Sequence, residues 1–327
     1  MLDAAYYRER GERLAAALRR LPAPFAFAPI TPELRGLWLR YQPRTTVSSR
    51  SLLSACAYAQ EDAMLCWEDR EHGCLLVLLL ESDNSLLAFP PLGGFESPRF
   101  EPARFEGAIA RLRRIFELAG EPFRLAYMSG REAARLRRLP GYEVWTDPGE
   151  SDYIYLVSEL TRFDGPENSN RRMNRARFLR RHRVSAELID SPGRIADCRL
   201  VLDGWCAARD CGGCGFRCVR DVALRALRDL GDLRAAGVVL YMDGEPEALA
   251  LLGMMGGGMA DLLSICARRR HTGLSFHLID QACRLCAPGA AYLNFEEDIG
   301  IPGLRRFKES LRPIRLLPKY RAKEAEQ

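Results

Sequence analysis

The sequence predicts a mixed α/β (α+β) chain of two domains, each a mixed, mostly antiparallel sheet flanked by helices. The chain has 327 residues, which is more than one ordinary domain uses. Strand and helix patterns alternate in both halves. The segment TDPGESD at 146–152 has the composition of a domain junction. We therefore expect an N-terminal domain over residues 1–148 and a C-terminal domain over residues 149–327.

The N-terminal half begins with a charged amphipathic segment over residues 1–20, which predicts a helix ended by Pro22 and Pro24. Residues 25–30 alternate as a strand. Thr31 and Pro32 then predict an N-cap and first turn for a helix through Tyr41. Further patterns predict strands at 74–80, 85–89 and 124–128, and helices at 104–120 and 131–139.

The C-terminal half is expected to open with a strand at 153–157, a very basic helix at 170–183 and a strand at 184–188. Helices follow at 195–208 and 221–230. Three strands at 237–242, 247–255 and 259–267 then predict an antiparallel meander, followed by a helix at 275–286 and a strand at 290–295. The glycine run 253–258 is interpreted as a hairpin turn, because no helix start or lysine follows it.

Basic residues, mostly arginine, cluster at 171–183 and again at 305–323, although the net charge is only +5. Arginine suits bidentate contacts to phosphate, so a polyanionic partner is one interpretation: a phosphate-rich cofactor, RNA or an anionic lipid headgroup. The alternative is that these are solvated helix faces. The candidate contacts for a polyanion are Arg171, Arg172, Arg312 and Lys319.

The chain contains 11 cysteines and no secretory signal, so we expect a cytoplasmic protein with mostly reduced, buried thiols. The longest strongly apolar stretch, 75–80, is far too short to cross a bilayer. One cysteine group surrounds a Gly-Gly turn and would allow a zinc or iron–sulfur site if the loop folds back: Cys206, Cys211, Cys214 and Cys218. We assign no metal, because buried free cysteines are frequent in this chain.

The order of three strands, an Arg/Gly loop, a helix and a strand resembles the core of the GNAT acyltransferase fold. The loop 270–275 is similar to the pyrophosphate loop of that family. A helix N-terminus offers unpaired N–H groups to phosphates, and a glycine permits close backbone approach. The donor, acyl-CoA or another phosphate-bearing molecule, stays open. The residues expected to contact it are Arg269, Arg270, His271, Thr272, Gly273 and Ser275.

The segment 292–308, YLNFEEDIGIPGLRRFK, carries the candidate catalytic residues. Alternation along the strand places Asn294 and Glu296 on one face, and Asp298 lies in the loop beyond. An amide and two carboxylates could position an acceptor and remove its proton. Arg305 and Lys308 could anchor phosphate or stabilise developing charge. The alternative is a buried polar cluster that only holds a loop in place.

The run from Asn294 to Arg305, with Lys308, Ser310, Pro313 and the Lys319-Tyr320 pair, resembles the C-terminal catalytic domain of phosphatidylglycerol lysyltransferases. Residues 152–155 and Asn174 are similar to the segment that opens that family's second domain. The resemblance implies two GNAT-like domains in tandem and adds Asn174 and Tyr320 to the binding residues. In characterised members, an aminoacyl group passes from aminoacyl-tRNA to a lipid headgroup.

The resemblance therefore implies an acyl- or aminoacyltransferase, with aminoacyl-tRNA or acyl-CoA as the donor substrate and no bound cofactor assigned. The membrane-embedded domain of the lipid-modifying members has no counterpart here. We accordingly expect a soluble small-molecule or peptide acceptor as well as an anionic lipid headgroup, the latter with the protein peripheral at the inner membrane face. The alternatives are a non-catalytic RNA- or anion-binding protein, or a metal or thiol protein built around Cys206–Cys218.

Overall fold

The structure is a computed structural model, and it describes residues 9, 12, 14, 16, 18, 21–22, 24–60, 62–81, 83–95, 101–208, 218–269 and 271–325. Most of the predicted helix over 1–20 lies outside these residues. The chain divides into two compact units: unit 1 is Met1–Asp152 with Leu317–Gln327, and unit 2 is Tyr153–Leu316. The unit boundary lies four residues beyond the predicted one, and the last segment joins unit 1 although we expected it in the C-terminal domain.

Unit 1 contains a sheet whose seven described strands run in the order β1-β2-β3-β4-β5-β14-β6. Neighbouring strands are antiparallel except for β4 and β5. The apolar run Cys74–Leu80 forms β3, which is buried along its whole length. The other strands are β1 (Ala28–Pro29), β2 (Leu65–Asp69), β4 (Leu86–Ala88), β5 (Arg124–Met128), β6 (Tyr142–Thr146) and β14 (Tyr320–Glu324).

The longest helix that the structure describes in unit 1 is α4 (Pro102–Ala119), which starts with proline in its first turn and ends at Gly120 in a left-handed conformation. Apolar residues at helical spacing, among them Phe105, Ile109 and Phe116, bury one face of α4 in the same core as β3. The shorter helices of this unit are α2 (Arg35–Tyr41), α3 (Leu52–Tyr58) and α5 (Gly130–Leu136).

Unit 2 contains a second sheet, whose described strands run in the order β13-β7-β12-β11-β10-β9-β8. The strands β9 (Ala235–Met242), β10 (Glu245–Gly256) and β11 (Met259–Ala267) form the predicted antiparallel meander. Helix α10 (Leu274–Cys286) then leads to β12 (Tyr292–Asn294), which pairs parallel to β11. The remaining strands are β7 (Asp152–Leu156), β8 (Val184–Leu188) and β13 (Arg315–Leu317). The fold class is confirmed, with two mixed sheets flanked by helices.

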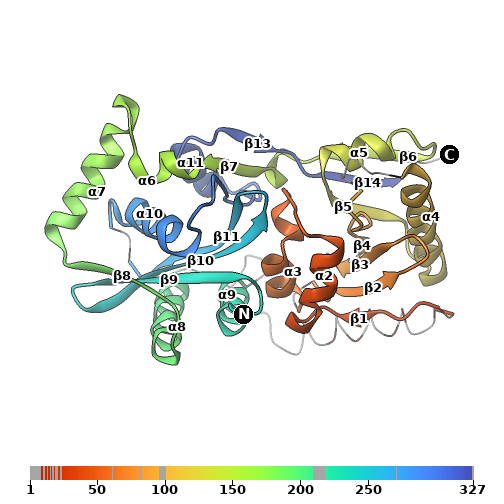
Figure 1. Cartoon of the computed structure of the whole chain (residues 1–327), viewed down its shortest axis with the longest axis horizontal. Helices are drawn as coiled ribbons and strands as arrows, with labels where there is room; N and C mark the ends of the chain where they lie inside the picture. Colours follow the sequence, from red (N-terminus) through yellow and green to blue (C-terminus); the bar gives the residue numbers. More distant parts are fainter. Residues whose placement is uncertain are drawn as a thin grey trace. The chain divides into compact units, whose positions relative to one another are not determined.

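Helices lie on both faces of the unit 2 sheet, α10 on one and α8 (Pro192–Ala207) with α9 (Val219–Arg228) on the other (Figure 1). Leu278 of α10 packs in one core with Leu240 and Leu262. The short α6 (Val157–Arg162) and the basic α7 (Ser169–Arg181) precede β8, and α11 (Pro302–Ser310) follows β12. The carboxyl end of β12 therefore opens into a loop that α11 closes.

Candidate functional site

Asp298 lies at the centre of a buried polar cluster in the loop that follows β12. Its Oδ2 accepts hydrogen bonds from the Tyr153 hydroxyl at 2.6 Å and from Arg305 Nε at 2.8 Å, and its Oδ1 accepts one from the Gly300 amide at 2.8 Å. These bonds, above all the one from Arg305, lower the pKa of Asp298 to about 2 even though burial alone would raise it. Burial and the bond to Asp298 raise the pKa of Tyr153 to about 12. Asp298 is therefore anionic at neutral pH and a weak base.

Lys308 closes the same loop from α11. Its Nζ donates hydrogen bonds to the carbonyl oxygens of Phe295 at 2.5 Å and Glu297 at 2.6 Å, and its own carbonyl accepts one from the Tyr155 hydroxyl at 2.7 Å. The side chain is buried, and the ammonium lies 5.4 Å from the centre of the Phe295 ring. Lys308 thus places a positive charge directly beneath the backbone that carries Glu296 and Asp298.

Asn294 ends β12 as a fully buried side chain whose Oδ1 accepts a hydrogen bond from the Glu296 amide at 2.8 Å. We predicted a strand through Phe295, but the backbone leaves the extended region at Glu296, where φ is +55°. The two side chains are therefore related by a turn and not by strand alternation. The left-handed conformation is costly for a non-glycine residue, and the Asn294 bond to the backbone stabilises it.

Asp261 is a site residue that the sequence analysis missed. It lies in β11 with no exposed surface, and its register partner on β12 is Asn294. Ala260 and Leu293 face the core beneath α10, so Asp261 and Asn294 lie together on the opposite face. A single acid inside the apolar strand MADLLSICA is the signal that could have identified it.

The predicted phosphate loop is packed against α7. Gly273 caps α10 with φ of +98°, and a Cβ there would lie 2.4 Å from the Asn174 carbonyl oxygen. The glycine therefore allows the α7 backbone to approach the loop. His271 Nε2 and Arg269 Nε lie 3.8 Å and 4.0 Å from the buried carboxylate of Glu247.

Two other loop residues differ in exposure, since Thr272 is exposed and Ser275 is half-buried. Arg270 lies outside the described residues.

The arginines of α7 separate into two groups. Arg171 and Arg172 hold backbone carbonyls, those of Ser310 and of Phe163, respectively, and Arg175 pairs with the buried Asp280. The second group is exposed and, within the part of the chain that the structure describes, forms no ion pair: Arg177, Arg180 and Arg181. Arg171 and Arg172 are thus engaged within unit 2, and the polyanion contact that we expected of them stays a prediction.

Lys319 occupies a different environment from the one we expected. It is buried in unit 1, where Nζ lies 2.8 Å from Asp152 Oδ1 and 3.2 Å from the Ser49 hydroxyl. Tyr320 lies in β14 with the Arg137 guanidinium 5.2 Å from its ring centre. Because its charge is already paired inside the unit, Lys319 stabilises the fold of unit 1 and is not a surface contact for a polyanion.

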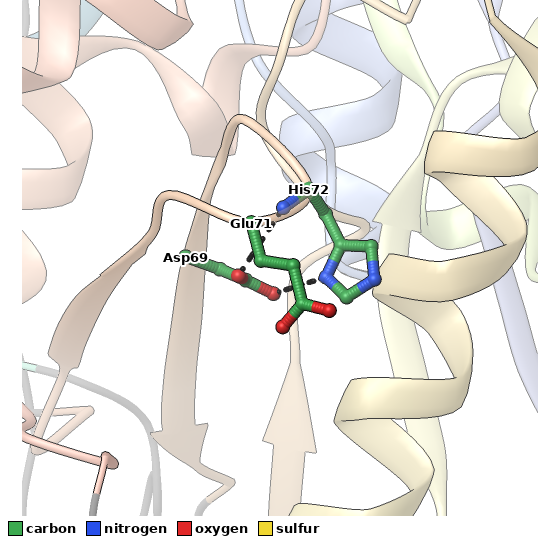
Figure 2. A group of neighbouring side chains, drawn as sticks. All are labelled: Asp69, Glu71 and His72. Carbon is green, nitrogen blue, oxygen red and sulfur yellow. Dashed lines mark hydrogen bonds and ion pairs between the residues drawn. The ribbon is translucent and has the colours of Figure 1, made fainter.

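The metal candidates fall into two groups. In the cysteine group, Cys206 and Cys218 are half-buried, and Cys211 and Cys214 lie outside the described residues. Figure 2 shows three side chains of unit 1 whose possible ligand atoms lie close enough together to hold one metal ion: Asp69, Glu71 and His72.

The unit 1 group already has a cation. His72 Nδ1 lies 2.7 Å from Asp69 Oδ2, and the Arg111 guanidinium pairs with Glu71 and lies 3.9 Å from Asp69. Arginine therefore supplies the positive charge that these carboxylates need, and we assign no metal to them.

The comparisons with known proteins agree with this architecture. The family model described as phosphatidylglycerol lysyltransferase, C-terminal, matches residues 46–323. A conserved protein of unknown function from Bacteroides thetaiotaomicron is similar over 91% of this chain and 99% of its own, with a TM-score of 0.81 and 21% identity. L-PGS from Bacillus licheniformis matches over 91% and 93%, with a TM-score of 0.64 and 16% identity. No curated protein matches the sequence.

The structure of FemX is also similar, with a TM-score of 0.59 and 11% identity over 92% of this chain and 98% of that one. At these identities the structural neighbours show the fold. Among the described residues, no helix is long and apolar enough to cross a membrane. The family match supports an aminoacyl- or acyltransferase in general.

Proposed function

Because this chain belongs to the family of phosphatidylglycerol lysyltransferase C-terminal domains, we propose that it transfers an aminoacyl group from aminoacyl-tRNA to a hydroxyl or amine acceptor. The observation that carries the proposal is the polar cluster at the carboxyl end of β12. There, Glu296 is held in a left-handed turn between Asn294 and the paired ions Asp298 and Arg305. A strained, over-determined backbone of this kind is typical of a functional site.

We assign the proton transfer to Glu296. Asp298 is too weak a base, because its pKa is about 2, and it instead orients Arg305 and Tyr153. Glu296 removes the proton from the acceptor, which attacks the ester carbonyl of the donor. The carbon–oxygen bond to the terminal ribose breaks, and the ribose oxygen takes up the proton. We assign the stabilisation of the oxyanion that forms in between to the cations Arg305 and Lys308.

We further propose that Asp261 and Asn294, which we call the floor of the site, receive the ammonium group of the transferred amino acid. Asp261 and Asn294 lie side by side on β11 and β12, on one face of the sheet. A carboxylate and an amide oxygen are acceptors suited to an ammonium group. An acetyl group has no ammonium, so this floor favours an aminoacyl group over a simple acyl group.

The packing of α7 against Gly273 favours aminoacyl-tRNA over acyl-CoA as the donor. A pyrophosphate bound in the usual way needs free space above the glycine at the start of α10. In this protein the Asn174 carbonyl oxygen occupies that space, and it would repel an anion. The unpaired arginines on the outer face of α7 instead provide an electrostatic contact for RNA phosphates.

The test compares Glu296→Gln with Glu309→Gln, since Glu309 is an exposed carboxylate on α11. Transfer from a pool of radiolabelled aminoacyl-tRNAs to peptide, amino-sugar and lipid acceptors is measured for both. We expect Glu296→Gln to lose a factor of about 100 or more in rate, and Glu309→Gln to behave like the natural protein. Equal rates for the two variants would refute the assignment of the base. tRNA binding without transfer would favour the non-catalytic alternative.

A further inference from the structure

A pocket of ≈470 Å³ in unit 2 is lined mainly by polar and charged residues. Its walls are α6, the turn that leads into α7, and the segment that follows α11. Pro313 and Ile314 form a small apolar wall. The charged lining consists of three arginines and three carboxylates: Arg162, Arg171, Arg312, Glu159, Asp164 and Glu167.

These six side chains are not neutralised by one another. Within the described part of the chain, none of them forms an ion pair. Arg171 is held in place by Asn168 and by the Ser310 carbonyl. Glu159 and Glu167 are close enough to act on Arg171 electrostatically without forming an ion pair with it. Charges that line one pocket without pairing are available to a ligand.

Arg171 and Arg312 form the cationic side of the pocket. Arg312 follows α11 in a left-handed conformation, with φ of +61°, which brings it into the pocket lining beside Arg171. Burial, followed by the charge of Arg312, lowers the pKa of Arg171. Two neighbouring guanidinium groups that form no ion pair in the described part of the chain attract an anionic group, and arginine binds carboxylates and phosphates bidentately.

We propose that this pocket binds a small zwitterion, an amino acid or a short peptide, with its carboxylate between Arg171 and Arg312. The ammonium group lies against Glu159 or Glu167, and the side chain contacts Ile314. An inorganic anion would leave the three carboxylates unpaired, whereas a zwitterion satisfies both sides. The inference concerns a site separate from the polar cluster at Asp298 and does not depend on the transfer reaction.

The pocket is connected to the helix that carries Arg305. Arg171 donates to the carbonyl of Ser310, the last residue of α11, and the same helix holds Asp298 through Arg305. A ligand that fixes Arg171 therefore also fixes the carboxyl end of α11. Occupancy of the pocket should slow hydrogen exchange in α11.

The test is calorimetric titration of the full chain with L-alanyl-L-alanine. The comparison ligands are its N-acetyl form, its carboxamide form and inorganic phosphate. We expect the free dipeptide to bind, and each blocked form to bind about tenfold or more weakly, because each lacks one charge-assisted contact. Equal affinity for the acetylated dipeptide, or tighter binding of phosphate, would show that the pocket takes an anion only and would overturn the proposal.

Single-arginine variants test whether the dipeptide binds in this pocket. Arg312→Gln should weaken dipeptide binding about tenfold, whereas Arg306→Gln, an exposed arginine of α11 that does not line the pocket, should not. Arg312 is exposed, so its replacement should not unfold the protein, and circular dichroism checks this. Undiminished binding by Arg312→Gln, or no binding of the dipeptide at millimolar concentration, would each overturn the proposal.

Discussion

Replacing Asp298 by asparagine removes the charge on which Arg305, Tyr153 and the Gly300 amide converge. In the folded protein the pKa of this carboxyl falls from its ordinary value of 3.8 to about 2. A depression of that size corresponds to up to about 2 kcal/mol of stabilisation at pH 7. Because the Arg305 side chain is 43% exposed, no buried charge is left behind, and the loss should not exceed that amount.

The pH dependence follows from the sign of the shift. A depressed pKa gives stability that is present above the unfolded value of 3.8 and is lost as the pH falls toward 2. The difference between the natural protein and Asp298→Asn should therefore be largest at pH 7. At pH 3 it should fall to roughly half, because the unfolded carboxyl is by then mostly protonated.

Hydrogen exchange of peptides from α11, followed by mass spectrometry, measures this difference locally. We expect Asp298→Asn to lower protection about 10- to 30-fold at pH 7 and less at pH 3. Glu309→Gln removes a carboxylate from the same helix at an exposed position and should leave protection unchanged. Unchanged protection in Asp298→Asn at pH 7, or a difference that grows on acidification, would refute the reasoning.

Three further predictions concern packing and charge. Gly273→Ala places a methyl group 2.4 Å from the Asn174 carbonyl oxygen at a positive φ. We therefore expect the free energy of unfolding to fall by about 2–4 kcal/mol, seen as a lower thermal midpoint. An unchanged midpoint would mean that α7 does not pack against Gly273. Lys319→Met removes the cation from the buried Asp152 and should cost about 3–5 kcal/mol in denaturant unfolding. Asp152→Asn in the same chain should restore part of that loss, and no restoration would contradict the pairing. The third change neutralises the three exposed arginines of α7, namely Arg177, Arg180 and Arg181. It should reduce the slope of log tRNA affinity against log salt concentration by about 2, and a constant slope would place the RNA contact elsewhere.

The sequence predicted the elements whose pattern is local. The apolar run of β3, the strand β5 and the meander of β9, β10 and β11 lie where they were expected. Their signals are continuous apolar stretches or alternation bounded by turns. Strand β2 was missed because LCWED mixes apolar and acidic residues, and β14 because YRAKE reads as a charged segment. Both acquire their strand structure from neighbouring strands, which a local pattern does not contain.

At the site, the sequence identified which residues gather but not what each one does. The motif placed Asn294, Asp298 and Arg305 near one another, and the structure brings them together around the loop between β12 and α11. The roles that we propose for Asp298 and Glu296 differ because Asp298 receives hydrogen bonds from Tyr153, Arg305 and Gly300, which a sequence pattern does not show. Asp261 reaches the site only through the register of β11 against β12, a relation between distant segments.

The position of β14 has a consequence for how the chain is made. This strand lies between β5 and β6 in the unit 1 sheet, yet it is synthesised after the whole of unit 2. A growing chain therefore holds an incomplete first sheet, with the edges of β5 and β6 that will pair with β14 still unpaired, until residues 320–324 emerge. Unit 2, contiguous in sequence, can fold first. Emergence of residues 320–324, and not of the first 152 residues, is then the event that completes unit 1.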